Sequence, residues 1–482
     1  MRGRALARRA CAAAVGAALV AAALTGCART TTGHATSIYD DPFRVAGLAA
    51  TNGPSGARAG APDARREVQG TDDGTVDRLA VNAIADLDEY WAMHFPGLFD
   101  AHAAPTVALA SWDPLAPDGG EFCGDTTSRL VNAGYCVADG TIGWDRTVLM
   151  PEVIDKFGVV AMVFVLAHEY GHAVQSAAGV VDHGPSATLV REQQADCYAG
   201  AFMRHVAAGE SPHFQLDTSD GLNAVLASTV AIGDTDPRDP GNVHGTAFER
   251  VTATQIGFTD GPAPCTRIDA DDIDARRTGL PQSFADTRDD GELAVTEDAV
   301  RRFVDSFARI LPLDRAPTLD VSTARLHCSD ADDTSPVSYC PETHTLGVDL
   351  AALEQRASTV GSGTRSDLFR TSLTGDYNAY VLLASRYTLA VQHARGQDVD
   401  TPVAALRTAC LSGVVTAALS SRGADVRLSP GDLDEAVSGL LTDGLAASDV
   451  SGRTVPSGFS RVDAFRTGVL GGDGACAGRY GA

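Results

Sequence analysis

The chain has 482 residues, of which 44% are hydrophobic and 21% are charged, a composition typical of globular proteins, and a chain of this length favours two domains. Its formal net charge of −24 argues against nucleic acid as a partner and against electrostatic adsorption to anionic lipid headgroups. The sequence contains no phosphate-binding loop, nucleophile elbow or basic aromatic patch.

The N-terminus predicts a lipoprotein signal peptide over residues 1–26. Four arginines precede an apolar stretch, and Leu24-Thr25-Gly26-Cys27 is typical of a bacterial lipobox. The cysteine of a lipobox is lipidated and becomes the first residue of the mature protein. We therefore expect an extracytoplasmic protein anchored to the bacterial cell membrane through a lipid on Cys27. The alternative is an ordinary secretory signal in which Cys27 is incidental.

Residues 27–75 are rich in small and polar residues without an apolar period, which predicts a flexible tether. The amphipathic run at 76–95, before Pro96, predicts the first helix. Extended stretches follow at 104–110 and 141–144.

After Pro151, a long apolar helix carries the sequence His168-Glu169-Tyr170-Gly171-His172. Two histidines four residues apart project from one face of a helix, and a glutamate after the first lies beside an ion that they hold. This HExxH pattern is typical of zinc hydrolases, in which a third protein ligand leaves the fourth position to water.

The third ligand is predicted on a second helix, from an N-cap at Ser186 to about Ala208. Glu192 and Asp196 lie one turn apart on this helix and share a face. The same arrangement is typical of gluzincin peptidases, where the glutamate binds zinc and the aspartate accepts the N–H of a ligating histidine. Such a carboxylate fixes the orientation of the imidazole ring.

The sequence resembles the bacterial neutral zinc metallopeptidases over about residues 76–268. The resemblance rests on the segments at 123–124, 135–136, 168–175, 192–200, 244–245 and 257–258, the last of these before Cys265. One departure is Ala173, where the family commonly has a second consecutive histidine. The resemblance implies a zincin-like α+β domain at about 76–270, with one Zn²⁺ held by His168, His172 and Glu192, and Glu169 as the catalytic residue.

The chemistry of such a site implies an endopeptidase acting on a peptide or protein. Zinc lowers the pKa of a bound water, Glu169 acts as general base, and the same residue returns the proton to the leaving amine. His244 is our first candidate for a donor to the oxyanion and Tyr170 the second. A surface histidine is the alternative for His244, and a structural role is favoured for Tyr170 because the second half retains Tyr387.

Two other features are expected to be structural. His183 lies between the two site helices, where an exposed loop histidine is the simpler interpretation. The acidic run at 269–274 lacks the glycine and the terminal glutamate of an EF-hand loop, so we expect residues 271–294 to form an acidic linker.

Five segments of the first half recur in the same order in the second, which predicts a tandem duplication at 295–482. They are 104–107 and 316–319, 135–145 and 339–349, 167–175 and 384–392, 197–200 and 410–413, and 248–251 and 459–462. The aligned second copy lacks the site: His168, Glu169, His172, Glu192, Asp196 and His244 become Ser385, Arg386, Leu389, Ala405, Ala409 and Val455. The predicted fold class is therefore a zincin-like domain followed by a degenerate, inactive duplicate, and only the first copy should bind zinc.

Eight cysteines are expected to form disulfides in an extracytoplasmic compartment, and the duplication reduces the number of possible pairings among them. If pairing stays within each copy, the short spacings favour bridges that close hairpins. The predicted disulfides are Cys123–Cys136, Cys197–Cys265, Cys328–Cys340 and Cys410–Cys476.

We therefore expect a membrane-anchored, zinc-dependent peptidase, a monomer whose two copies pair pseudo-symmetrically within the chain. The alternative is a protein that is not an enzyme, namely a non-catalytic envelope binding lipoprotein with a structural or relic zinc site.

Overall fold

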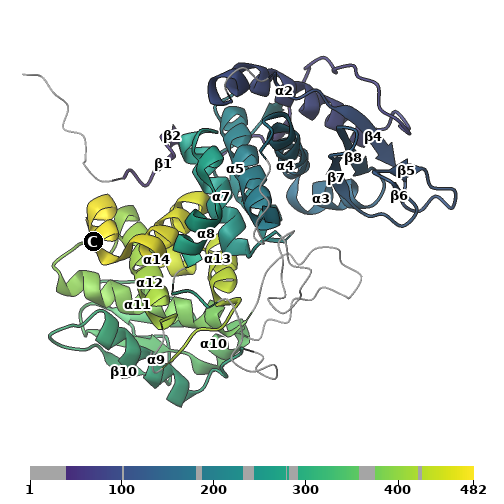
Figure 1. Ribbon diagram of the computed structural model, residues 1–482. Helices are drawn as coiled ribbons and strands as arrows, with labels where there is room; N and C mark the ends of the chain where they lie inside the picture. The colour runs from purple at the N-terminus through teal and green to yellow at the C-terminus, as the bar shows by residue number, and fades with distance from the viewer. Residues whose placement is uncertain are drawn as a thin grey trace, which may run out of the picture. The chain divides into compact units, whose positions relative to one another are not determined.

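The computed structural model describes residues 40–99, 103–180, 187–231, 244–277, 279–281, 291–357, 375–421 and 426–481. These residues contain both helices and short strands, and the fold belongs to the α+β class, as predicted (Figure 1). The predicted signal peptide with Cys27, the N-cap Ser186 and the loop residue His183 lie outside the described residues.

The first half contains a three-stranded sheet in the order β4-β8-β7. Its strands are β4 (Ala108–Trp112), β7 (Ala133–Cys136) and β8 (Thr141–Asp145), with β8 parallel to β4 and antiparallel to β7. Ile142 and Trp144 of the central strand are buried, and Trp144 Nε1 donates to Asp77 Oδ1 at 2.8 Å, which ties the sheet to the first helix. The strand predicted at 104–110 corresponds to β4, which begins and ends later in the chain, at Ala108–Trp112. The remaining strands of this half are β1 (Arg44–Val45), β2 (Leu48–Ala49), β3 (Gly56–Ala57), β5 (Glu121–Phe122), β6 (Asp125–Thr126) and β9 (Phe214–Gln215).

Helix α4 contacts α2, α3, α5 and α6, and α5 contacts α7 and α8, in the helical part of the first half. The helices of this half are α2 (Thr75–Leu98), α3 (Leu149–Phe157), α4 (Val159–Ala177), α5 (Ala187–Ala207), α6 (Asp220–Ala231), α7 (Ala247–Asp260) and α8 (Ala270–Arg277), with a 3₁₀ turn η1 (Pro264–Arg267).

Two predicted helix boundaries are wrong. The helix expected to end before Pro96 continues to Leu98. The backbone carbonyl of Ala92 would normally accept from the N–H of residue 96, which proline lacks, but Ala92 and Pro96 are exposed, so water can hydrate this carbonyl. The helix expected after Pro151 is divided into α3 and α4 at Gly158, whose φ of 85° is a left-handed conformation that favours glycine.

The predicted tether is also wrong from residue 40 onward, because this segment is attached to the first half. β3 pairs with β9, Ser55 Oγ donates to Asp217 Oδ2 at 2.5 Å, and Val45 is buried. Polar and backbone groups make several of these contacts, and they leave no apolar period in the sequence. The predicted acidic linker likewise begins as helix α8, in which Ile273 is buried and Arg276 pairs with Asp272.

The second half has a three-stranded sheet with the same pattern, in the order β10-β12-β11. Its central strand β12 (Thr345–Val348) is parallel to β10 (Thr318–Asp320) and antiparallel to β11 (Val337–Cys340). The helices are α9 (Glu297–Ile310), α10 (Leu350–Ala357), α11 (Asp376–Ala394), α12 (Pro402–Leu419), α13 (Asp432–Thr442) and α14 (Gly458–Tyr480, kinked at Gly472), with a 3₁₀ turn η2 (Leu445–Ala447).

A close helix contact at glycine occurs at equivalent places in the two halves, between α5 and α7 and between α12 and α14. A Cβ atom on Gly257 would clash with the carbonyl of Cys197, and a Cβ atom on Gly468 would clash with the carbonyl of Cys410. Glycine is therefore required at both positions.

Four disulfides join the pairs that were predicted from the sequence. Two close short loops, Cys123–Cys136 and Cys328–Cys340, and two join more distant segments, Cys197–Cys265 and Cys410–Cys476.

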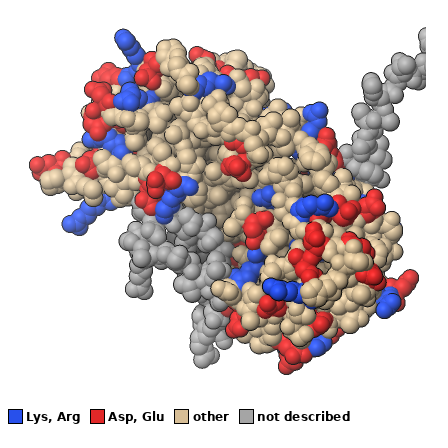
Figure 2. Space-filling view, turned by 180° about the vertical axis from the view of Figure 1, so that it is seen from behind, with Lys and Arg blue, Asp and Glu red and all other residues tan. Residues whose placement is uncertain are grey.

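Among the described residues, one helix is long and apolar enough to cross a membrane, namely α12. Its 18-residue window is 72% buried and it packs against α14, so α12 is accounted for as a core helix. On the face displayed in Figure 2, acidic and basic side chains are interspersed.

Candidate metal centre

The predicted metal ligands lie together where α4 meets α5. One ligand atom each from His168, His172 and Glu192 lies within 4.8 Å of the others. His168 Nε2 is 3.1 Å from Glu192 Oε2, and His172 Nε2 is 3.6 Å from Glu192 Oε1. Both Nε2 atoms therefore face one carboxylate. Two imidazole nitrogens and one carboxylate oxygen are the donors of many catalytic zinc sites, so these residues fit Zn²⁺.

Asp196 orients the first histidine from the opposite side of the ring. His168 Nδ1 lies 2.8 Å from Asp196 Oδ1, and both side chains are buried. A proton on Nδ1 is thereby directed to Asp196, and the Nε2 lone pair is left for a metal.

Arg250, on α7, holds Asp196 in turn and was not identified from the sequence. Its Nε donates to Asp196 Oδ2 and its second terminal nitrogen to Oδ1, each at 2.8 Å. This two-pronged pair fixes the carboxylate plane and offsets the cost of burying its charge. Arg250 belongs to a segment that recurs in the second half, but recurrence alone suggested packing and gave no reason to assign it to the site.

The second histidine is oriented by glutamines that the sequence also did not reveal. His172 Nδ1 lies 3.0 Å from Gln175 Oε1. The Gln175 amide donates to the backbone oxygen of Arg191 at 2.8 Å and to Gln194 Oε1 at 3.0 Å, which locks its orientation. The ring of His172 therefore also has a fixed Nδ1 partner.

The electrostatics of this cluster favour a bound positive charge. Burial alone would keep His168 neutral, but Asp196 and Glu192 raise the pKa of His168 to about 10. Burial opposes ionisation of Asp196, yet Arg250 and His168 lower the pKa of Asp196 to about 2. The pKa of Glu192 is likewise held well below its usual range by both histidines, against the effect of burial. A divalent cation bound by Glu192 and His168 would displace the second proton of His168.

The two predicted catalytic side chains are near these ligands. Glu169 lies on α4 between the histidines and is half-buried. His244 Nε2 is 3.9 Å from Glu192 Oε2, and the side chain of His244 is 42% exposed. Tyr170, in contrast, donates to Asp88 Oδ1 at 2.8 Å and is buried, in keeping with a structural role.

The aligned positions of the second half hold a different set of side chains. Arg386 is fully buried and donates to Ser448 Oγ at 2.8 Å and to backbone oxygens of Leu445 and Asp449 at 3.3 Å. Burial lowers the pKa of Arg386 to about 10. The other aligned residues that the structure describes there are also buried: Ser385, Leu389, Ala405, Ala409 and Val455. Neither an arginine nor these side chains offers a usual zinc ligand.

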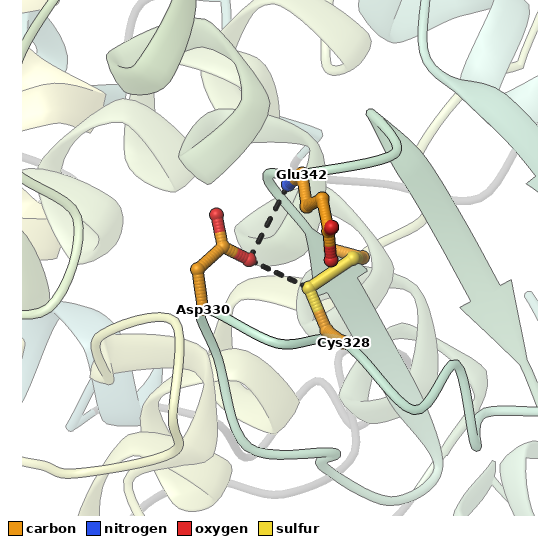
Figure 3. A group of neighbouring side chains, drawn as sticks. Cys328, Asp330 and Glu342 are labelled. Carbon is orange, nitrogen blue, oxygen red and sulfur yellow. Dashed lines mark hydrogen bonds between the residues drawn. A yellow bond between two sulfur atoms is a disulfide. The ribbon is translucent and has the colours of Figure 1, made fainter.

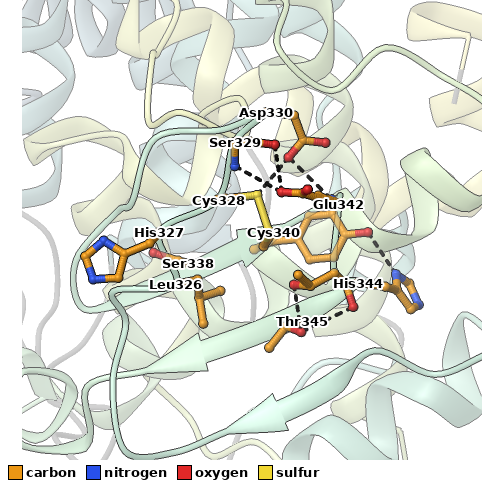
Figure 4. Close-up of a disulfide and its surroundings, with 12 residues drawn as sticks. Leu326, His327, Cys328, Ser329, Asp330, Ser338, Cys340, Glu342, His344 and Thr345 are labelled. Atoms are coloured by element: carbon orange, nitrogen blue, oxygen red, sulfur yellow. Dashed lines mark hydrogen bonds between the residues drawn. A yellow bond between two sulfur atoms is a disulfide. The ribbon is translucent and has the colours of Figure 1, made fainter.

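A group of acidic and sulfur side chains in the second half does not fit a metal. Figure 3 shows Asp330 Oδ1 beside Cys328 Sγ, at 2.7 Å, and accepting from the backbone N–H of Glu342 at 3.3 Å. Both sulfurs of this group form the disulfide Cys328–Cys340, drawn with its surroundings in Figure 4, so no thiolate remains to bind a metal. The carboxylate of Glu342 accepts from the backbone and hydroxyl of Ser329, which makes this a loop-stabilising group.

Comparison with known proteins agrees with this geometry. The family described as "Putative neutral zinc metallopeptidase" matches residues 12–267. The uncharacterized protein Rv2575 of Mycobacterium tuberculosis is 31% identical over 200 residues, which cover 34% of this chain and 68% of that protein. The uncharacterized protein YpfJ of Escherichia coli K12 is 29% identical over 208 residues, covering 38% of this chain and 68% of that protein. No solved structure matches the chain.

Proposed function

The chain belongs to the neutral zinc metallopeptidase family, and we propose that it is an endopeptidase that hydrolyses peptide bonds at the site on α4 and α5. The observation that carries this proposal is the convergence of His168 Nε2 and His172 Nε2 on the carboxylate of Glu192, with Asp196 behind the first ring. A helix of the second half that lacks these residues keeps its fold, so packing alone does not require them.

His168, His172 and Glu192 would hold one Zn²⁺ per chain. When bound in such a site, the ion polarises a peptide carbonyl and lowers the pKa of water towards neutrality. Glu169 accepts the proton of the attacking water and delivers it to the leaving amine. His244, beside Glu192, donates a hydrogen bond to the oxyanion. Asp196 keeps the Nδ1 proton of His168 in place, so that Nε2 stays available.

Replacing the general base tests the proposal. Glu169→Gln should bind zinc as the unchanged chain does, because Glu169 is not a ligand, and should lose at least about 100-fold in casein cleavage, in line with removing a general base. Glu89→Gln, an exposed change on α2, is the matched control and should keep full activity. Unchanged zinc-dependent cleavage by Glu169→Gln would refute the catalytic role, and bound zinc without cleavage of any peptide would favour a binding lipoprotein.

We further propose that residues 295–482 are a degenerate duplicate of the first copy. The shared strand order of the two sheets, the matched disulfides and the equivalent close contacts at Gly257 and Gly468 support it. A stable and fully active chain without residues 295–482 would argue against any role of this copy in catalysis.

The proposed location is the outer side of the bacterial cell membrane, with a lipid on Cys27. The support is the lipobox at residues 24–27. Cys27→Ala should release the protein from the membrane fraction and abolish incorporation of a labelled fatty acid. A membrane-bound Cys27→Ala chain would refute the anchor.

A further inference from the structure

The two halves contact each other through helices α6 and α7 of the first and α13 and α14 of the second. Two hydrogen bonds across this contact are reciprocal. The backbone N–H of Phe248, at the start of α7, donates to Asp434 Oδ1 on α13 at 2.8 Å. The backbone N–H of Gly458, at the start of α14, donates to Asn223 Oδ1 on α6 at 2.6 Å. Each half therefore caps the N-terminus of a helix in the other.

Sequence positions indicate that the two capping side chains are equivalent. Asn223 lies as far before Phe248 in the chain as Asp434 lies before Phe459. Both capping side chains present an oxygen to backbone N–H groups that have no partner within their own helix. Asp434 is buried and also approaches Thr246 and Ala247, so it holds the first residues of α7 at several points.

The two capped helices differ in what they support. In α7, Arg250 donates to both oxygens of Asp196, which holds His168. In α14, Arg461 donates to the backbone oxygens of Leu440 and Val455, at 2.7 and 2.8 Å. A shift of α7 would thus reach the metal ligands directly through the ion pair of Arg250 with Asp196. A shift of α14 would instead act on α7 through Phe459, whose backbone oxygen accepts from Gln255 Nε2 at 2.9 Å and whose ring contacts Phe258.

The start of α7 carries a second group of the site. His244 lies two residues before the N-cap Thr246, whose side chain accepts from the N–H of Glu249 in a capping box. Glu249 is in turn paired with Arg277 of α8. Fixing this end of α7 therefore also fixes where His244 meets Glu192.

We propose that Asp434 is a positioning residue of the metal centre and that the second half completes the site of the first by holding the start of α7. The inference rests on the proposed function, because it assumes that His168, His172 and Glu192 bind zinc. The second copy would then be retained because its Asp434 holds helix α7 of the first copy, although the second copy has no metal site of its own.

Zinc affinity of three full-length variants tests the proposal. Asp434→Ala removes the cap of α7, and Asn223→Ala removes the equivalent cap of α14. Asp434→Asn keeps an oxygen acceptor, as Asn223 does in its own half. Zinc affinity would be measured by competition with a chromophoric chelator, and thermal unfolding would be followed on the same samples.

We expect Asp434→Ala to bind zinc about tenfold more weakly, at the lower end of the effect of removing a group that supports a ligand. Asn223→Ala should keep zinc affinity within about twofold while it lowers thermal stability to a similar degree, and Asp434→Asn should restore the affinity. If Asp434→Ala does not fold, Asp434→Leu, which has no acceptor and leaves no cavity, takes its place with the same expectation.

Unchanged zinc affinity in Asp434→Ala, or an equal loss in Asn223→Ala, would overturn the proposal, since the first result removes the connection to the site and the second shows general loosening. Absence of zinc binding by the unmodified chain would instead refute the proposed function. The two failures are therefore distinguishable.

Discussion

Asp196 is the side chain at which stability and metal affinity can be separated most cleanly. It is fully buried, and it binds His168 on one side and the buried Arg250 on the other. Asp196→Ala leaves the charge of Arg250 in the interior without this partner, a change that typically costs about 3–5 kcal/mol of unfolding free energy. The same change removes the acceptor of His168 Nδ1, so zinc affinity should fall about 10- to 100-fold.

A second substitution divides these two effects. Asp196→Ala combined with Arg250→Met removes both charges, so it should recover most of the lost stability, because replacing a whole buried ion pair by apolar groups is often neutral. It should not recover zinc affinity, since His168 still lacks its acceptor. Urea unfolding and chelator competition on the same samples measure the two quantities. A loss below about 1 kcal/mol for Asp196→Ala, or a double variant less stable than the single one, would refute the reasoning.

Further predictions concern acidity, packing and the disulfides. Burial together with neighbouring carboxylates raises the pKa of Asp376 to about 7 and that of Glu435 to about 9. The folded chain therefore binds more protons than the unfolded chain between pH 3.8 and about 7 at Asp376, and between pH 4.5 and about 9 at Glu435. Its free energy of unfolding should fall as the pH rises through these two ranges. Glu435→Gln should flatten that slope in urea unfolding between about pH 5 and pH 9, and an unchanged slope would contradict the assignment. Gly257→Ala should lower the free energy of unfolding by about 3 kcal/mol, because the added Cβ meets the carbonyl of Cys197. Gly474→Ala, which has open space around it, is the control and should not destabilise the chain. Equal thermal stabilities of the two variants would contradict the close approach at Gly257. Replacing Cys197 and Cys265 together by alanine should cost about 4 kcal/mol, because their sequence separation of 68 closes a long loop in the unfolded chain, and a far smaller loss would show that this loop is already restricted without the bridge.

The clustering of His168, His172 and Glu192 was predictable because helix geometry links the spacing of residues to the direction of their side chains. His168 and His172 are four residues apart on one helix, as are Glu192 and Asp196 on the next. Residues at this spacing project from the same face of a helix, so the sequence alone predicts which side chains lie together. The disulfide pairs were predictable because the two halves repeat the same cysteine spacing and so restrict the possible pairings.

Residues that support the site were not predictable in this way. Arg250 meets Asp196 across 54 residues of sequence, and the cap from Asp434 to Phe248 spans 186. Single hydrogen bonds between distant helices leave no periodic signal in a sequence. The segment from residue 40 to 75 was missed for a related reason, since polar and backbone groups attach it to the body, and Arg58 for example donates to the backbone oxygen of Ser211 at 2.9 Å.

The most direct test of the central claim is to locate the metal. Crystals of the full chain grown with zinc would be measured on both sides of the zinc absorption edge, and the anomalous difference map would be inspected over both halves. We predict one peak, bounded by His168 Nε2, His172 Nε2 and Glu192. No peak at these atoms, or a zinc ion bound in the second half instead, would contradict the account.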